Sequence, residues 1–304
     1  MNTIILQNRK TAILTAWVFM LMASGLPTII LKEIIGQNVQ NEWRILSAGI
    51  VMFSGVLLTF VWRPIRALRP FFILFIILNI AEWLIYVKVS NLPIWKNWQS
   101  DPSFNVSMLA TQFLRMLITL MVIAAMFILK QKPASFFLVK GDTSAAVEPV
   151  KWMGVNEGER WNRFGRNLSV MITLGTLTFL IVAGRPSLDI AIRALPFLPA
   201  ILLAAAMNAF SEEMTYKASF LSVLEDVVGS RQALWLMAAY FGIGHFYGVP
   251  YGMIGVLMAG FLGWLLGKSM LETRGLFWAW FIHFWQDVMI FIFLAIGSIA
   301  VGGG

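Results

Sequence analysis

Two glutamates and two histidines stand out in this sequence because they lie within apolar segments. Glu212 and Glu213 are adjacent, His245 and His283 are the only histidines, and Asp287 follows four residues after His283. Carboxylates and imidazoles are the side chains that most often accept and donate protons in hydrolysis. A charged group in hydrocarbon costs on the order of 2.5 kcal/mol or more, so each of these residues needs a partner or a function. They are the first candidates for an active site.

Helical spacing separates the roles of the two glutamates. Residues four apart share a helix face, so Asn208 and Glu212 project together. Glu213 and Lys217 form a second set, about 100° around the helix, and can pair with each other. Glu212 is then the carboxylate left to face a cavity, where it can accept a proton from water.

The two histidines have different neighbours. His283 and Asp287 are four residues apart, so the carboxylate can orient the imidazole. His245 follows Phe241-Gly242-Ile243-Gly244, whose small residues permit close approach of a substrate or a helix. Each element alone has an ordinary structural explanation, such as a solvated cap or a hydrogen-bonded core histidine. Their combination favours a functional site.

Three segments carry a family resemblance: Ser211-Glu212-Glu213-Met214-Thr215-Tyr216-Lys217, Phe241-Gly242-Ile243-Gly244-His245 and His283-Phe284-Trp285-Gln286-Asp287. They resemble the motifs Glu-Glu-x-x-x-Arg, Phe-x-x-x-His and His-x-x-x-Asn or Asp of the CAAX protease and bacteriocin-processing family of intramembrane proteases, which is type II CAAX prenyl endopeptidase-like. The resemblance covers residues 190–295. Lys217 departs from the usual arginine and cannot make a planar bidentate fork.

The resemblance implies an intramembrane endopeptidase that hydrolyses a peptide bond of a membrane-associated or lipidated protein or peptide. Glu212 would activate water, while His245, and His283 with Asp287, would position the water and stabilise the oxyanion. Glu213, Lys217 and Asn208 are expected to support this site. We expect no cofactor. The alternative is a zinc ion held by Glu212, His245 and His283.

Two further functions remain open from the sequence. Buried carboxylates and histidines also build proton relays, so a proton-coupled transporter is one alternative. A non-catalytic membrane scaffold with the same fold is the other. Serine and cysteine proteases are disfavoured, because the chain contains neither Gly-x-Ser-x-Gly nor cysteine.

The composition predicts that these residues lie within a lipid bilayer. Lipid is then the expected partner of most of the protein surface. Hydrophobic residues make up 59% of the 304 residues and charged residues 12%, and the mean hydropathy is +0.77. Such a chain predicts an all-α, polytopic transmembrane helix bundle of about nine spans, with eight as the alternative. The expected spans are 11–31, 45–62, 70–88, 108–129, 168–184, 190–217, 232–249, 251–268 and 275–296. The catalytic cavity is expected in the last four.

Basic residues predict the orientation of the chain. Arg115 lies within a span, and 16 of the other basic residues fall on the N-terminal side of the membrane against six on the opposite side. The positive-inside rule then predicts a cytoplasmic N-terminus and an outside C-terminus. The same asymmetry explains the net charge of +8 without nucleic acid. We expect a bacterial cytoplasmic membrane and a site that opens toward the cytosol.

The chain divides into five expected regions. These are N-terminal transmembrane helices at 1–132, a cytoplasmic or interfacial connection at 133–167, an additional transmembrane helix at 168–189, a catalytic helix bundle at 190–296 and a flexible tail at 297–304. Glu82 and Arg115 lie on consecutive spans with opposite charge, so we expect them to pair and lock those helices together.

Overall fold

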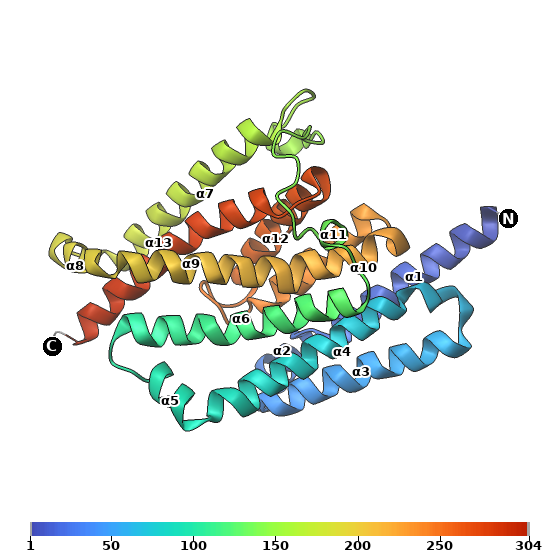
Figure 1. Cartoon of the computed structure of the whole chain (residues 1–304), viewed down its shortest axis with the longest axis horizontal. Coiled ribbons are helices and arrows are strands. Elements are labelled where there is room, and N and C mark those ends of the chain that lie inside the picture. The colour runs from blue at the N-terminus through green and yellow to red at the C-terminus, as the bar shows by residue number, and fades with distance from the viewer. Residues whose placement is uncertain (1, 303–304) are drawn as a thin grey trace.

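Apolar runs with proline only in their first turn form the long helices, because a helix satisfies its own backbone hydrogen bonds where water is absent. The computed structural model describes residues 2–302, with side chains for residues 8–300. Figure 1 shows long helices lying side by side across the molecule. They are α1 (Asn2–Ala23), α3 (Asn41–Val61), α4 (Arg69–Trp83), α6 (Phe104–Ile128), α7 (Trp161–Gly184), α9 (Leu198–Glu212), α11 (Ser230–Gly244), α12 (Met253–Thr273) and α13 (Phe277–Gly302).

Shorter helical elements join or extend these helices. The short α-helices are α2 (Leu26–Ile29), α5 (Pro93–Gln99), α8 (Leu188–Arg193) and α10 (Ser219–Val228). Three π-helical turns are η1 (Ile30–Ile34), η3 (Leu84–Lys88) and η8 (Glu213–Ala218). The 3₁₀ turns are η2 (Arg63–Leu68), η4 (Val89–Asn91), η5 (Pro133–Phe136), η6 (Lys151–Met153) and η7 (Leu195–Phe197).

The all-α bundle is confirmed, but the described residues reach the predicted alternative of eight spans at most, and not nine. Within residues 2–302, seven stretches are long and apolar enough to cross a membrane, or eight if α1 and the bent α2–η1 segment form one span. A ninth span at residues 232–249 is not supported. The helix there, α11, has 15 residues. It is about 22 Å long, short of the roughly 30 Å hydrocarbon core.

The first expected span, 11–31, is bent where α1 ends. Its two parts meet at an angle of 48°. Ser24 Oγ donates a hydrogen bond to the carbonyl of Leu21 at 2.8 Å, and Pro27 has no N–H with which to continue the helical ladder. The bend directs α2 across the end of α11, where Gly25 packs against Ile243.

The helix that carries the two glutamates is longer than predicted. α9, η8 and α10 form one path from Leu198 to Val228, in which the N–H of Ser219 bonds to the carbonyl of Met214, five residues back. We expected this helix to end at residue 217, near the cytoplasmic surface. Instead Lys217, one of the 16 basic residues assigned to the N-terminal side of the membrane, is fully buried. Glu212 lies near the middle of the path.

The long connection after α6 folds back onto the turn between α12 and α13. The N–H of Asp142 bonds to the carbonyl of Thr273 at 2.8 Å, and the indole N–H of Trp161 donates to Glu272 at 2.7 Å. Trp161 is buried and begins α7. Residues 161–167, expected in the connection, therefore belong to the helix.

The ends of the described chain lie on opposite sides of the bundle. Figure 1 shows the N-terminus at the right, and α5, α8 and the C-terminus at the left. α13 continues to Gly302, so residues 297–302 are helical where a flexible tail was expected. The tail residues 303 and 304 lie outside the described residues.

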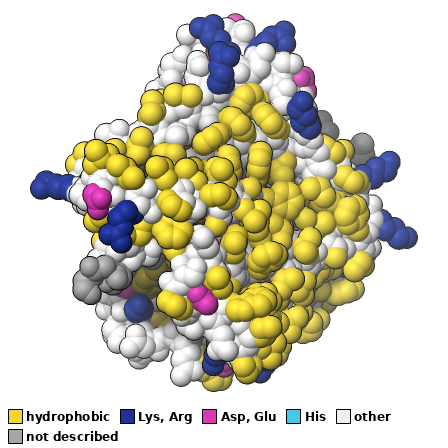
Figure 2. Space-filling view, turned by 60° about the vertical axis from the view of Figure 1, so that its left-hand side comes forward, with side chains coloured by type: hydrophobic (Ala, Val, Ile, Leu, Met, Phe, Trp, Pro, Cys, Tyr) yellow, Lys and Arg dark blue, Asp and Glu magenta, His cyan; other side chains and the backbone are white. Residues whose placement is uncertain are grey.

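The outer surface is suited to lipid. Figure 2 shows a broad apolar face with lysine and arginine side chains toward its margins. α7 contributes exposed Met171, Leu174 and Val182, and only 11% of its most apolar stretch of 18 residues is buried. An apolar face of this extent would be unstable in water. The protein is therefore an integral membrane protein.

Glycine sets how closely α11 and α12 approach. A Cβ atom at Gly242 would lie 2.6 Å from the carbonyl oxygen of Val256 and 3.0 Å from the Cα of Gly260. Both contacts are with backbone, which cannot turn aside as a side chain can. Gly244, two residues later, has no such neighbour within 4 Å. The pairing of α11 with α12 thus requires Gly242 and places His245 at the end of α11.

We predict that Gly242→Ala destabilises the protein and that Gly244→Ala does not. The methyl group at position 242 must push two backbones apart, and overpacking of this kind costs about 1–3 kcal/mol. Thermal unfolding in detergent, followed by intrinsic tryptophan fluorescence, should show a lower midpoint for Gly242→Ala alone. Equal midpoints for the two variants would contradict the packing role of Gly242.

Candidate active site

The fold brings the predicted site residues together from three helical segments. Glu212 ends α9, Glu213 and Lys217 lie in η8, and Asn208 lies one turn earlier. His245 directly follows α11. His283 and Asp287 lie on α13, which packs against α9. Residues separated by up to 79 positions in the chain are thus in contact.

Glu212 is the centre of the cluster. Its Oε2 lies 3.9 Å from Nε2 of His245 and 3.7 Å from Nε2 of His283. The Glu212 side chain is 14% exposed, against 38% for His245 and 6% for His283. One carboxylate oxygen therefore faces two imidazole nitrogens, one at a cavity wall and one buried.

The other nitrogen of each imidazole is fixed by a hydrogen bond. Nδ1 of His245 lies 2.8 Å from the carbonyl oxygen of Phe241, and Nδ1 of His283 lies 2.6 Å from Oε1 of Glu213. Both partners are acceptors, so both Nδ1 atoms carry a proton and donate. This arrangement aims both Nε2 atoms at Glu212.

The predicted pair between Glu213 and Lys217 forms. Nζ of Lys217 lies 2.7 Å from Oε1 of Glu213, and neither side chain has any exposed surface. The ammonium also lies 3.4 Å from the centre of the Phe241 ring, a cation–π contact. A compact ammonium fills this site without the bidentate fork of an arginine.

The carboxylate that orients His283 is Glu213, and the predicted partner Asp287 has a different position. Asp287 Oδ1 is 3.5 Å from Nε2 of His283, too far for a hydrogen bond, although it lies within ion-pair reach. Its closest partner is Asn208, whose Nδ2 donates to Asp287 Oδ2 at 2.9 Å. Helical spacing correctly places Asp287 beside His283, but the nearer carboxylate comes from another helix.

Two cavities meet at Glu212, Phe241 and His245. The larger has a volume of about 490 Å³ and is lined by polar groups that include Arg44, Glu82 and Tyr86. The smaller has a volume of about 170 Å³ and lies against α12 and α13. Apolar side chains dominate its outer wall: Val249, Pro250, Met258, Ala259, Leu262 and Ile290.

The mouth of the larger cavity lies at the end of the bundle opposite the N-terminus. Its exposed lining residues include Asn41, the first residue of α3, and Tyr247, in the turn after α11. Both residues come after helices that run away from the N-terminal end. The orientation of the bundle in the membrane is not tested by this geometry, so the cytoplasmic N-terminus and the site open to the cytosol stay predictions.

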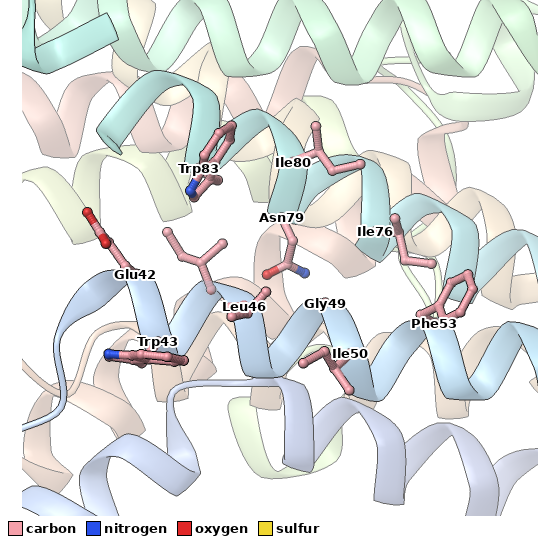
Figure 3. Close-up of a pocket in the computed structure, with 11 residues that line it drawn as sticks. Glu42, Trp43, Leu46, Gly49, Ile50, Phe53, Ile76, Asn79, Ile80 and Trp83 are labelled. Carbon is pink, nitrogen blue, oxygen red and sulfur yellow. The ribbon is translucent and has the colours of Figure 1, made fainter. Parts of the chain in front are cut away.

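A third cavity, of about 480 Å³, lies apart from this cluster in a groove between α3 and α4. Figure 3 shows Asn79 projecting between the two helices among aliphatic side chains. Asn79 donates to the carbonyl of Phe75 at 2.8 Å. Glu42 is the one titratable side chain among the described residues that line the groove. The groove lacks the groups that hydrolysis needs.

The cluster lies within a region similar to a known family. Residues 194–289 match the family model described as type II CAAX prenyl endopeptidase Rce1-like. This CAAX-endopeptidase-like region contains Glu212, His245, His283 and Asp287, and the match confirms the predicted family resemblance. No curated protein and no solved structure matches the chain.

One partner of the CAAX-endopeptidase-like cluster comes from outside the matched region. Nη1 of Arg115, on α6, donates to Glu212 Oε1 at 3.2 Å and to Oδ1 of Asn208. In the sequence Arg115 is a charged residue within an apolar span, and this feature could have identified it as a candidate site residue. Its position on α6 gave no indication that it contacts α9.

The predicted pair between Glu82 and Arg115 is wrong. Glu82 accepts a hydrogen bond from the Tyr216 hydroxyl at 3.2 Å and lies 3.8 Å from Arg44. Arg44 lies in the first turn of α3, beside the end of α4 that carries Glu82. A nearer cation has replaced Arg115 as the partner of Glu82.

The residues suggested as zinc ligands are Glu212, His245 and His283. Among the described residues, no three histidine, aspartate or glutamate side chains are placed to hold a metal ion. Glu212 has its Oε1 engaged by Arg115, and a cation next to a carboxylate competes with a metal for the same oxygen. Glu212 Oε2 nevertheless faces both Nε2 atoms, so the zinc alternative stays a prediction.

We predict strong coupling between Glu213 and Lys217. Removing one partner leaves a buried charge without compensation, which costs about 3–5 kcal/mol, whereas removing both leaves none. Lys217→Met and Glu213→Gln should each lower the unfolding midpoint in detergent more than the double variant does. Additive losses in this double-mutant cycle would show that the pair is not coupled.

Proposed function

We propose that this protein is an intramembrane endopeptidase that uses water activated by Glu212 to cleave a peptide bond of a membrane-associated protein or peptide. The supporting observation is the approach of one Glu212 oxygen to two imidazole nitrogens where two cavities meet. The CAAX-endopeptidase-like match over the same residues supports the hydrolase class.

Glu212 is proposed as the general base. The two Nε2 atoms lie 3.7 and 3.9 Å from Oε2, so a water oxygen about 2.8 Å from Oε2 has room to come within hydrogen-bond distance of an imidazole nitrogen. Glu212 takes a proton as the water oxygen attacks the carbonyl carbon. It then gives that proton to the departing amine, and the C–N bond breaks.

The histidines are proposed to stabilise the negative charge that develops on the carbonyl oxygen. His283 is buried between Glu213 at one nitrogen and Asp287 near the other, and these carboxylates stabilise its protonated form. A fixed N–H donor in a dry site is effective at this task. His245 is more exposed and would contact the water and the substrate at the cavity wall.

The two cavities indicate how a peptide would lie. A chain that passes Glu212 would place one flank in the larger polar cavity and the other against the apolar wall formed by α12 and α13. Both cavities lie within a bundle whose outer surface is apolar. A substrate that resides in or on the bilayer can reach the site without leaving the bilayer.

We predict that Glu212→Gln abolishes cleavage while the protein stays folded. Loss of a general base typically lowers the rate by about 10²–10⁴-fold. Comparative proteomics of host membranes that contain wild-type or Glu212→Gln protein should reveal a precursor that accumulates only with the variant. Glu157→Gln, a change at an exposed position in the long connection, is the matched control.

The precursor and purified protein in proteoliposomes then complete this test. The wild-type protein should release a peptide product, and Glu212→Gln should not. Product formation by Glu212→Gln at the wild-type rate would overturn the proposed mechanism. Proton flux that depends on the precursor, without any product, would instead indicate transport.

We predict that cleavage needs no bound metal. Treatment of the purified protein with 1,10-phenanthroline, followed by metal analysis, should leave the rate of precursor cleavage unchanged. Loss of activity that returns with added zinc would establish the metalloprotease alternative.

A further inference from the structure

The two oxygens of Glu212 have different surroundings. Oε1 receives Nη1 of Arg115 at 3.2 Å and Nδ2 of Asn208 at 3.3 Å. Oε2 faces the two histidines. Two donors on one oxygen fix the plane of the carboxylate, so that the second oxygen is presented to the junction of the cavities.

Arg115 also fixes the direction of the Asn208 amide. A guanidinium can only donate, so the amide oxygen of Asn208 must face it. The amide nitrogen is then turned toward Glu212 at 3.3 Å and Asp287 at 2.9 Å. One side chain of α6 therefore orients both Glu212 and the residue that holds Asp287.

The distribution of charges in the cluster also indicates that Arg115 orients Glu212. Glu212, Glu213 and Asp287 bring three carboxylates close together, and Lys217 is committed to Glu213 at 2.7 Å. Within the described residues, Arg115 is the remaining arginine or lysine at ion-pair distance from Glu212. Its side chain is 39% exposed to the larger cavity, so it is not required there to fill the core.

We propose that Arg115 is a positioning residue for Glu212, so that a helix outside the CAAX-endopeptidase-like region completes the active site. This inference rests on the proposed function of Glu212. It predicts that residues 194–289 alone are not a sufficient catalytic unit, because the orientation of the base depends on α6.

Arg115→Gln and Arg115→Lys test the proposal. We expect kcat for the accumulating precursor to fall on the order of 100-fold in Arg115→Gln, as when one preorganised donor is lost. KM should change by less than about threefold, because Arg115 acts through Glu212. Arg115→Lys keeps the charge and should restore part of kcat, although its ammonium lacks the planar fork.

Thr119→Val is the matched structural control. Thr119 lies one turn after Arg115 on α6, and its hydroxyl is 2.9 Å from the hydroxyl of Thr215 in η8. The substitution removes another contact between the same helices without touching Glu212. We expect a lower unfolding midpoint and a much smaller loss of kcat than in Arg115→Gln, because Thr119 lines the larger cavity but does not contact Glu212. Equal losses of kcat in Thr119→Val and Arg115→Gln would show that Arg115 contributes only to helix packing, which would overturn the proposal.

A second measurement needs no substrate. Carbodiimides modify carboxyl groups, and an ion-paired carboxylate reacts slowly. Labelling with dicyclohexylcarbodiimide, quantified by mass spectrometry of the peptide that contains Glu212, should be severalfold faster in Arg115→Gln than in the wild-type protein or in Thr119→Val. Unchanged labelling would overturn the proposal even if Arg115→Gln were inactive or unstable.

The two hypotheses fail in different ways. Wild-type kcat in Arg115→Gln, with Glu212→Gln inactive, would reject the role of Arg115 and keep the peptidase. Cleavage by Glu212→Gln would reject the peptidase mechanism. Faster labelling of Glu212 in Arg115→Gln would then still support the control of this carboxylate by α6.

Discussion

The cluster depends on the ion pairs that compensate one buried charge, the carboxylate of Glu213. It has no exposed surface, and a single oxygen receives both Lys217 at 2.7 Å and His283 at 2.6 Å. Lys217 in turn lies over the ring of Phe241 on α11. One charge that must be compensated thus joins η8, α13 and α11, and the relative positions of these segments determine where both histidines point.

The same constraint gives the adjacent glutamates different properties. Glu213 is surrounded by partners that neutralise it, whereas Glu212 has one oxygen paired and the other directed to the place where the cavities meet. A preorganised hydrolytic site requires a rigid supporting group, here Glu213, and a reactive group with limited access to solvent, here Glu212. The expectation from helical spacing, that the two side chains have separate roles, agrees with this geometry.

Sequence patterns predicted what depends on local spacing. The apolar runs located the helices, and residues four apart predicted the pair between Glu213 and Lys217. Spacing could not predict contacts set by how a neighbouring helix is rotated. For that reason Glu82 was paired with the wrong arginine, and Asp287 was expected to orient His283, although its imidazole donates a hydrogen bond to Glu213. The length of the helix after Lys217 was missed because a buried lysine looks like a helix end in the sequence.

The π-helical turn Glu213–Ala218 also bears on how this chain can change in length. Its wider hydrogen-bonding pattern accommodates one residue more than an α-helix, so α9 and α10 present independently set faces although no loop separates them. Removal of this extra residue would restore an α-helical turn, so the faces of α9 and α10 would be kept and the side chains within the turn would be displaced. The turn holds Glu213 and Lys217, so the loss of one residue there would disturb their ion pair. The same loss in a regular part of α9 would instead rotate Glu212 by about 100° relative to the residues before it.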